Sequence, residues 1–502
     1  MSDAVTVKFL RRTLIAGAAA VALFAGFAAV PTLMSRPAGA QEITPSAVAP
    51  PSGAPMSFAD LIERVRPAVV SIVVRQQPGA AAQTPEGLPP GFEEFFRGRP
   101  GRPGPAPTAL GSGFFINESG VIVTNHHVID GAEEITIRTG DGRELPADIV
   151  GSDQATDLAV LRVRGGGRFP YVTFDDARHV RVGDWVVAVG NPFGLDGTAT
   201  AGIVSAIGRR DAGSSAYVDY LQIDAPINRG NSGGPTFDLN GNVIGVNSAI
   251  FSPTGGSVGI GFAIPSETAD TIVRQLLAAG RVTRGWIGVS IQPLDDDIAR
   301  SLGLAEARGA LVASVVPDGP AARAGIQQGD VILTLDGQSI EDSRDLTQRV
   351  GATPVGRNAR VEILRNGSHR TLQMRLAERP SEQVLASTTP TPNATPEPES
   401  GVGVAQSGLG LSVRPLNPED RSRYQLGANE TGLVVTSVEP TSDAAEKGVR
   451  VGDVILQAGG RSIRTAQELA SAADAARRAG RPLLLQIDGR AGRRFIAADV
   501  SE

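Results

Sequence analysis

The hydrophobic residues between positions 68 and 264 fall into short, β-branched runs that are separated by Gly, Asn and Asp. Runs of this length with turn residues on both sides are typical of β-strands. Many short strands at this spacing predict an all-β barrel or sandwich. We expect strands at Ala68–Val74, Gly113–Ile116, Val121–Thr124, Glu134–Arg138, Leu158–Val163, Trp185–Val189, Gly202–Ile207, Tyr217–Ile223, Val243–Ser248 and Gly259–Ile264.

Helical patterns flank this β-rich region. Residues 57–66 predict a short helix before the first strand. After the last strand, we expect Ser266 to cap a helix that ends at Gly280. The apolar face of that helix would be formed by Ile272, Val273, Leu276 and Leu277. We take this helix as the end of a first domain that covers residues 57–280.

A long segment rich in Gly and Pro interrupts the strand pattern between residues 76 and 110. It contains the aromatic motif Phe92-Glu93-Glu94-Phe95-Phe96-Arg97. A loop of this length in a compact domain is usually functional or disordered. We therefore interpret residues 76–110 as a long loop that is either functional or disordered.

An internal repeat follows the first domain. Gly309–Ile340 aligns without gaps on Gly432–Ile463, and both segments contain Gly-Asp-Val-Ile-Leu. Such self-similarity indicates duplicated units, and we expect small α+β domains at residues 281–379 and 408–502. The stretch between them, residues 380–407, is rich in Pro, Thr, Ser and Glu. This composition cannot bury a core, so it predicts a flexible linker.

The N-terminus has the pattern of an export signal. Lys8, Arg11 and Arg12 precede an apolar run at Leu14–Val30, and Pro37-Ala38-Gly39-Ala40 follows it. A basic segment, an apolar segment and small residues at the end are typical of a secretory signal peptide. We expect residues 1–40 to be this signal, with an uncleaved anchor as the alternative, and residues 41–56 to be a linker. Either form leaves the bulk of the protein outside the cytoplasm.

Composition narrows the candidate chemistry. The chain has no cysteine, four histidines and a net charge of −6. The absence of cysteine excludes disulfides and thiolate nucleophiles, and so few histidines argue against a His-rich metal site. The net negative charge gives no indication of a nucleic-acid-binding surface. A hydrolase that needs no metal or cofactor fits this inventory.

A candidate nucleophile lies in the segment Gly230-Asn231-Ser232-Gly233-Gly234. The glycines allow a tight turn around Ser232 and a close approach of substrate. Such a turn can direct the N–H groups of Gly230 and Ser232 at one point, as an oxyanion hole requires. A plain Gly-rich surface turn is the alternative interpretation of this segment.

Catalysis by a serine also requires a base and a group that orients the base. His126 and His127 follow a predicted strand, where neighbouring side chains point to opposite faces, so either could face a cleft. Asp157 opens the apolar run Leu158–Val163, and Asp153 in the preceding loop is its rival. The order His, Asp, Ser in an all-β domain predicts a two-barrel serine protease, whereas an α/β-hydrolase esterase would need the order Ser, Asp, His.

Several motifs resemble those of the Do-like (HtrA) serine proteases: Gly111-Ser112-Gly113-Phe114, Thr124-Asn125-His126-His127-Val128, Asp157-Leu158-Ala159-Val160-Leu161, Gly190-Asn191-Pro192-Phe193-Gly194 and Gly230-Asn231-Ser232-Gly233-Gly234-Pro235. The resemblance implies a chymotrypsin-like double β-barrel followed by two PDZ domains. It selects His127, Asp157 and Ser232 as the triad, with Gly230, Ser232 and also Asn231 as oxyanion donors.

The same resemblance implies regulation and assembly. Residues 76–110 would be a regulatory loop that reaches a neighbouring subunit, and Arg209 would relay activation. The family implies a periplasmic homotrimer, with larger cages open to members that have two PDZ domains.

Two kinds of peptide recognition are expected. Ala225, Pro226 and Ile227 carry no charge, so an S1 pocket that includes Ile227 would favour Val, Ala or Ile before the cut. PDZ domains bind a peptide C-terminus along a sheet edge. Their carboxylate loops would be Trp286-Ile287-Gly288-Val289 and Gly408-Leu409-Gly410-Leu411.

The sequence thus predicts a serine endopeptidase that degrades unfolded or damaged envelope proteins. A chaperone or scaffold that holds unfolded clients, with proteolysis secondary, is the alternative. The intact triad favours the endopeptidase.

Overall fold

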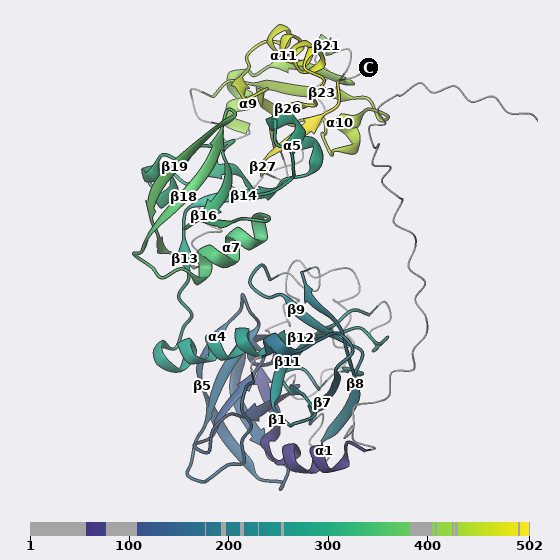
Figure 1. Ribbon diagram of the computed structural model, residues 1–502, viewed down its shortest axis with the longest axis vertical. Coiled ribbons are helices and arrows are strands. Elements are labelled where there is room, and N and C mark those ends of the chain that lie inside the picture. Colours follow the sequence, from purple (N-terminus) through teal and green to yellow (C-terminus); the bar gives the residue numbers. More distant parts are fainter. Residues whose placement is uncertain are drawn as a thin grey trace, which may run out of the picture. The chain divides into compact units, whose positions relative to one another are not determined.

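The computed structural model describes residues 57–76, 108–175, 177–191, 197–210, 215–228, 230–252, 256–381, 404–406, 409–423, 426, 430–489 and 492–500. In these ranges the chain forms two closed β-barrels and then two further sheets with helices (Figure 1). The predicted signal segment, the linker at 41–56, the Phe92–Arg97 motif and most of the 380–407 linker lie outside the described residues. No helix within the described ranges is long and apolar enough to span a bilayer.

The first barrel is antiparallel and closes in the order β1-β2-β3-β6-β5-β4. Its strands are β1 Val69–Gln76, β2 Thr108–Phe115, β3 Val121–Thr124, β4 Ala132–Arg138, β5 Glu144–Asp153 and β6 Leu158–Val163. The second barrel closes in the order β10-β11-β12-β9-β8-β7. Its strands are β7 Trp185–Gly190, β8 Thr198–Arg209, β9 Tyr220–Ile223, β10 Pro235–Phe237, β11 Val243–Ile250 and β12 Gly261–Pro265.

The strand pattern was predicted well, with two omissions, but the predicted 76–110 loop was wrong at both ends, because Gln76 ends β1 and β2 begins at Thr108. Strand β5 escaped notice because Pro146 and Gly151 look like breakers and only some of its positions are buried. Strand β10 has three residues and begins with a proline after two glycines. Both strands form because their barrel neighbours supply the pairing, which a local pattern does not reveal.

Alternating side chains build two kinds of core. On β3, Ile122 points into the first barrel, whereas Val121 and Val123 join a cluster shared by both barrels. Successive residues of a strand face opposite sides, which explains this division. The shared cluster also takes in Leu61 of α1 (Ala59–Val65) and Leu276 of α4 (Ser266–Ala279). The barrels are therefore fixed to one another by a common hydrophobic core.

Helix α4 differs in two details from the prediction. Gly280 ends the helix with φ of +70°, as expected, but Ser266 is its first residue and makes no cap. The Ser266 hydroxyl donates instead to the Asp175 carbonyl at 2.6 Å. Leu277 is 36% exposed, because the buried face runs through Ile272, Val273 and Leu276 and turns away from it.

The first repeat contains a sheet in the order β14-β15-β16-β18-β19, with β17 on β16, and a separate pair β13-β20. Its strands are β13 Gly285–Trp286, β14 Val289–Pro293, β15 Ala310–Val315, β16 Val331–Leu335, β17 Gln338–Ser339, β18 Asn358–Arg365, β19 Ser368–Arg375 and β20 Ala377–Glu378. Its helices are α5 Asp296–Leu302, α6 Pro320–Ala324 and α7 Ser343–Ala352.

The second repeat follows the same plan in the order β21-β22-β23-β24-β26-β27, with β25 on β24. Its strands are β21 Val404–Gln406, β22 Leu411–Pro415, β23 Leu433–Val438, β24 Val454–Ala458, β25 Arg461–Ser462, β26 Leu483–Gly489 and β27 Gly492–Ala498. Its helices are α9 Pro418–Arg423, α10 Asp443–Glu446 and α11 Ala466–Arg478. The linker prediction was wrong over Val404–Gln406, which form strand β21.

Candidate active site

His127 and Asp157 form a tightly bonded pair. The Nδ1 atom of His127 lies 2.9 Å from Oδ1 and 2.8 Å from Oδ2 of Asp157. The backbone N–H of His127 also donates to Oδ1 at 3.0 Å. A carboxylate on Nδ1 orients the ring and leaves Nε2 to act on a substrate or a nucleophile.

The backbone brings the two residues together. Asp157 has a φ of +58°, a left-handed conformation that is costly for a non-glycine residue and is over-represented at functional sites. Its carbonyl accepts hydrogen bonds from the His126 N–H at 3.1 Å and from the Asn125 Nδ2 at 2.9 Å. The turn before β6 is thereby tied to the start of α3 (His126–Ile129).

The expectation that the two histidines sit on a strand end was wrong. They occupy the first two positions of the short helix α3, because the chain turns after Thr124. Neighbouring helical residues are about 100° apart and not on opposite faces. His127 reaches the Asp157 carboxylate, whereas the Nδ1 of His126 is buried without a hydrogen-bond partner among the described residues.

A hydroxyl from the other barrel completes the environment of Asp157. Ser248 on β11 donates from Oγ to Oδ2 at 2.8 Å. Burial alone would raise the pKa of the Asp157 carboxyl, but the charge of His127 and the hydrogen bonds from His127 and Ser248 bring that pKa below its ordinary value. The carboxylate therefore stays ionised. Sequence reasoning did not single out Ser248, since a serine on a buried strand carries no local signal.

Asp153, the rival of Asp157, has a structural partner. It forms a two-pronged ion pair with Arg284 at 2.7 and 2.6 Å, and both side chains are almost fully buried. Its carboxylate also accepts from the N–H and the hydroxyl of Thr156, at 3.1 and 2.5 Å. Asp153 thus holds the turn that leads to Asp157 and does not contact His127.

Ser232 lies in a buried loop whose conformation requires glycine at positions 233 and 234. Gly233 has a φ of +82°, and a Cβ there would come within 2.3 Å of the Ser112 carbonyl oxygen. A Cβ on Gly234 would come within 2.2 Å of the Val189 carbonyl oxygen. Ser232 is 5% exposed, and its Oγ has no hydrogen-bond partner among the described residues. The hydroxyl is therefore available for another contact.

Ser112 on β2 fastens this loop to the first barrel. Its hydroxyl donates to the Gly230 carbonyl and accepts from the Asn191 N–H at 2.8 Å. Its own N–H donates to the Ser232 carbonyl at 2.9 Å. Ser112 stood in one of the motifs quoted above, but its role as an anchor was not predicted. Its position between two glycines was the available signal.

The N–H groups of the predicted oxyanion donors differ in the hydrogen bonds that they make. The Asn231 N–H donates to the Asn228 carbonyl at 3.0 Å and is used within the loop. Among the described residues, nothing accepts from the N–H groups of Gly230 and Ser232. Gly230 has a φ of +100°, which glycine alone adopts freely. The geometry thus favours Gly230 and Ser232 over Asn231 as donors.

The residues predicted for the S1 pocket are buried. Ile227 has no exposed surface and packs with Ala225, Ile223 and Val204 in the core of the second barrel. The segment contributes apolar surface only. Its role in substrate selection stays a prediction.

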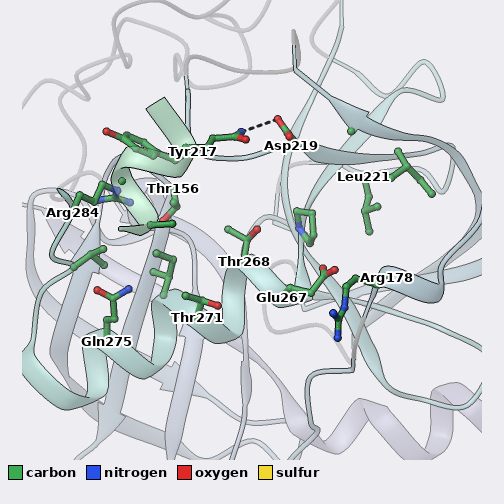
Figure 2. A pocket seen from close by; sticks show the side chains of 18 of the residues that line it. Thr156, Arg178, Tyr217, Asp219, Leu221, Glu267, Thr268, Thr271, Gln275 and Arg284 are labelled. Carbon is green, nitrogen blue, oxygen red and sulfur yellow. Dashed lines mark hydrogen bonds between the residues drawn. The ribbon is translucent and has the colours of Figure 1, made fainter. Parts of the chain in front are cut away.

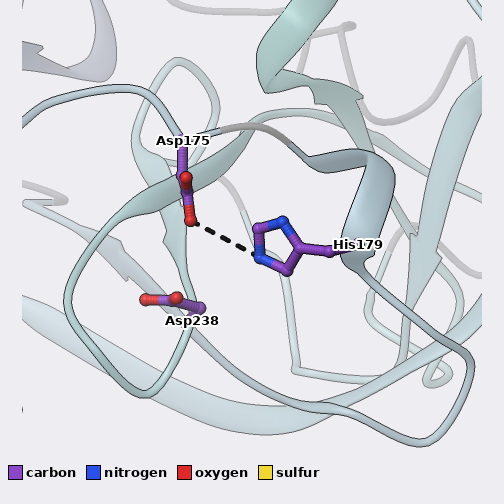
Figure 3. A group of neighbouring side chains, drawn as sticks. All are labelled: Asp175, His179 and Asp238. Carbon is purple, nitrogen blue, oxygen red and sulfur yellow. Dashed lines mark ion pairs between the residues drawn. The ribbon is translucent and has the colours of Figure 1, made fainter.

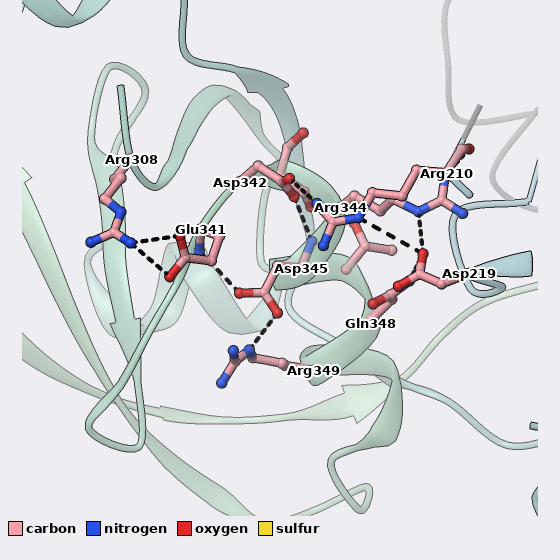
Figure 4. Close-up of polar contacts among 11 residues, drawn as sticks. Arg210, Asp219, Arg308, Glu341, Asp342, Arg344, Asp345, Gln348 and Arg349 are labelled. Atoms are coloured by element: carbon pink, nitrogen blue, oxygen red, sulfur yellow. Dashed lines mark hydrogen bonds and ion pairs between the residues drawn. The ribbon is translucent and has the colours of Figure 1, made fainter. Parts of the chain in front are cut away.

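Arg210, and not Arg209, makes the contacts that reach the first repeat. Arg209 itself is exposed and hydrogen-bonded within the barrel, from Nε to a glutamine on β9 at 2.8 Å. Arg210 pairs with Asp342 at 2.5 Å and lies 4.0 Å from Asp219. Arg344 on α7 donates to Asp219 at 3.1 Å and to the Arg210 carbonyl at 2.9 Å (Figure 4). The relay role of Arg209 stays a prediction, and these contacts belong to Arg210.

The first carboxylate loop has a defined conformation. Gly288 has a φ of +76°, and the carbonyls of Ile287 and Gly288 accept from Ala321 and Val316 at 2.8 and 2.9 Å. In the second loop, Gly410 has a φ of +64°, and its carbonyl accepts from Glu439 at 2.7 Å. Gly408 lies outside the described residues, while Leu409 and Leu411 are buried.

Two other groups of residues are distinct from His127, Asp157 and Ser232. A cavity of about 720 Å³ is lined by Thr156, Tyr217, Asp219, Glu267 and Arg284 among others, and Gln348 donates to Asp219 beside it at 3.0 Å (Figure 2). Asp175, His179 and Asp238 bring potential metal-binding atoms within 4.8 Å of one another (Figure 3). The Asp238 carboxylate already accepts hydrogen bonds from the backbone N–H groups of Asn240 and Asn242, both at 2.9 Å. Aspartate side chains commonly make such hydrogen bonds in turns.

Two antiparallel six-stranded barrels, with a His–Asp pair on one and a serine in a glycine loop on the other, define a chymotrypsin-like serine protease. Residues 111–246 match the model of the trypsin-like peptidase domain, and residues 285–376 and 402–488 each match a PDZ domain.

The chain is 44% identical to a probable periplasmic DegP-like serine endoprotease of Brucella melitensis, over 97% of this chain and 98% of that protein. It is 41% identical to a protein of the same description from Rhizobium meliloti, over 98% and 100%. The HtrA-type protease AlgW, solved with a tripeptide, superimposes with a TM-score of 0.56 at 40% identity, covering 65% of this chain and 99% of that one. The protein belongs to the DegP-like (HtrA) family of periplasmic serine endoproteases.

Proposed function

We propose that Ser232 is the nucleophile of this endoprotease, with His127 as general base and Asp157 as the residue that orients it. The observation that carries the proposal is the two-pronged contact of His127 Nδ1 with Asp157, at 2.8 and 2.9 Å, together with a buried Ser232 Oγ that has no hydrogen-bond partner among the described residues. The carboxylate fixes the orientation of the imidazole ring, and Ser232 supplies the nucleophilic oxygen.

The residues divide the reaction between them. Ser232 Oγ bonds to the scissile carbonyl carbon while His127 takes the hydroxyl proton and then gives it to the departing amine. The N–H groups of Gly230 and Ser232 stabilise the negative oxygen that forms. Water then enters, His127 takes its proton, and hydrolysis of the ester releases the acid product and restores Ser232.

The test compares the exported chain, beginning near Gln41, with its Ser232→Ala variant on an unfolded, casein-like substrate. Degradation by the first protein and none by the second is expected. If the variant degraded the substrate equally well, Ser232 would not be the nucleophile. If both proteins only suppressed aggregation, the chaperone alternative would take precedence.

For substrate preference we propose small aliphatic residues, Val, Ala or Ile, before the cut. The support is the apolar and uncharged surroundings of Ile227 and Ala225. The same digestion tests this, because fragment ends can be sequenced by mass spectrometry. Cuts predominantly after Lys, Arg or Asp would contradict the proposal.

We also propose that unfolded proteins are engaged through the PDZ domains and that the working form is a trimer or a larger cage. The first loop, Trp286–Val289, supports peptide binding because it precedes a sheet edge, at β14, on which a peptide strand can be added. The structures of the relative AlgW with a tripeptide and with a decapeptide support it. Light scattering of the purified chain tests the assembly, and a monomeric mass would contradict it.

A further inference from the structure

The two PDZ domains differ at the sheet edge where a ligand would bind. In the first domain, β14 is the terminal strand of its sheet and pairs only with β15 among the described residues. Gly285 and the first loop residue, Trp286, form β13, which pairs elsewhere, with Glu378 and Ala377 of β20. The outer edge of β14 is thus unpaired.

In the second domain, the equivalent edge carries a strand of the same chain. Strand β21 pairs antiparallel with β22, with Val404 opposite Val413, Ala405 opposite Ser412 and Gln406 opposite Leu411. The strand β21 also contacts helix α11, the counterpart of α7 (Figure 1). It therefore lies at the groove between the loop strand and the helix.

The direction of β21 matches that of a bound peptide. A ligand whose terminal carboxylate reaches the loop must run toward it, and β22 begins at the loop and runs away from it. Such a ligand therefore pairs antiparallel with β22. Strand β21 runs antiparallel, and its last residue, Gln406, lies opposite Leu411 at the loop end.

We infer that Val404–Gln406 is an internal ligand of the second PDZ domain, and that peptide C-termini bind the first domain and not the second while β21 is in place. The inference rests on the proposed peptide binding of the first domain. It makes the second groove a self-occupied site that opens only when β21 is displaced. A tethered strand competes at an effective concentration of about millimolar.

The connections of the two domains explain why only one edge is covered. Val282–Arg284, which precede the first loop by the same spacing, are held by the protease domain. Thr283 N–H donates to Gln275 at 3.2 Å, and Arg284 is paired with Asp153. Covering an exposed edge also removes a site of unwanted pairing. The segment before the second loop is preceded in the chain by the first repeat and not by the protease domain, and it can serve this purpose.

Hydrogen exchange of the full-length Ser232→Ala chain tests the internal ligand directly. A Val404→Pro/Ala405→Pro variant removes the N–H donors of two consecutive residues, one of which faces β22 in an antiparallel ladder, and disfavours the paired conformation. We expect the β22 amides that face β21 to exchange about tenfold faster in this variant, as for a locally opened edge. The Val404→Thr/Ala405→Thr variant retains both donors and should behave like the parent. Unchanged exchange in the proline variant would overturn the inference.

A photoreactive peptide gives the functional readout. The probe is a decapeptide with valine at a free C-terminus and benzoyl-phenylalanine three residues before it, and the same peptide with an amidated end is the control. In the parent we expect labelling of the β14–α7 region only, and in the proline variant labelling of the β22–α11 region as well. Equal labelling of both domains in the parent would refute self-occupation. Absence of labelling in both domains, with the exchange effect intact, would refute peptide binding by the first domain and leave the internal ligand standing.

Discussion

Ser248, on β11 of the second barrel, donates a hydrogen bond of 2.8 Å to the Oδ2 of Asp157 on the first barrel. The carboxylate that orients His127 is therefore held from both barrels. A relative movement of the barrels would remove this donor, so the shared core that packs them together also keeps the Ser248 hydroxyl beside the Asp157 carboxylate.

Replacing Ser248 by Ala should lower kcat about tenfold and leave KM nearly unchanged, because one hydrogen bond to a charged group is lost away from the substrate. Steady-state hydrolysis of a fluorogenic peptide measures both constants. Ser252→Ala is the matched control, since Ser252 is equally buried and its hydroxyl donates to the Gly256 carbonyl at 2.6 Å. Equal losses in both variants would mean that the effect is structural.

Replacing Ser112 by Ala should cost about 1–3 kcal/mol of unfolding free energy and lower kcat. The substitution leaves the buried Asn191 N–H without its acceptor and releases the Gly230 carbonyl. Urea denaturation and peptide hydrolysis measure the two effects. Ser71 lies directly opposite Ser112 on β1, and its buried hydroxyl has no partner among the described residues. Ser71→Ala should therefore be almost silent, and a similar loss there would contradict the anchoring role.

Replacing Gly233 by Ala should reduce kcat on the order of 100-fold, because the displaced loop misplaces an oxyanion donor. The new Cβ would come within 2.4 Å of Thr124 Oγ1 at a φ of +82°. Gly208 has a similar φ of +73° but open space around it, so Gly208→Ala separates backbone strain from the clash. Peptide hydrolysis by both variants decides the point, and equal activities would show that the loop tolerates the shift.

The acid limb of the stability curve should depend on Asp157. In the unfolded chain, the Asp157 carboxyl has its ordinary pKa of 3.8. In the folded protein, burial raises this pKa, but His127 and Ser248 lower it by more. The unfolded state therefore binds more protons between the two pKa values. The stabilisation is complete above pH 3.8 and is lost as the pH falls through the lower pKa that Asp157 has in the folded protein.

Thermal unfolding of the Ser232→Ala chain at several pH values checks this dependence. Adding Asp157→Asn should flatten the fall in Tm below about pH 4, since the titrating group is gone. Asp60→Asn, an exposed change on α1, is the control and should leave the slope as it is. A parallel slope in the Asp157→Asn variant would contradict the linkage.

Most of the fold was predictable because its signals are local. The continuous apolar runs that mark β3 and β6 arise because side chains on both faces of each strand lie in a core, and both strands were predicted with their observed bounds. The strands that were not predicted contain misleading local signals. Pro146 in β5 and Pro235 in β10 resemble breakers, and β21 lies in a segment whose composition favours a linker.

The sequence by itself determined the class of chemistry. Ser232 is marked by the glycines that its loop requires, and His127 and Asp157 are marked by the motifs around them. Only the tertiary structure could assign Ser248, Ser112 and Arg210, whose partners lie 91, 118 and 132 positions away in the chain. A serine on a buried strand looks the same in sequence whether it bonds to a catalytic carboxylate or to nothing. Its role arises when barrel closure and barrel packing bring a distant acceptor within hydrogen-bonding distance.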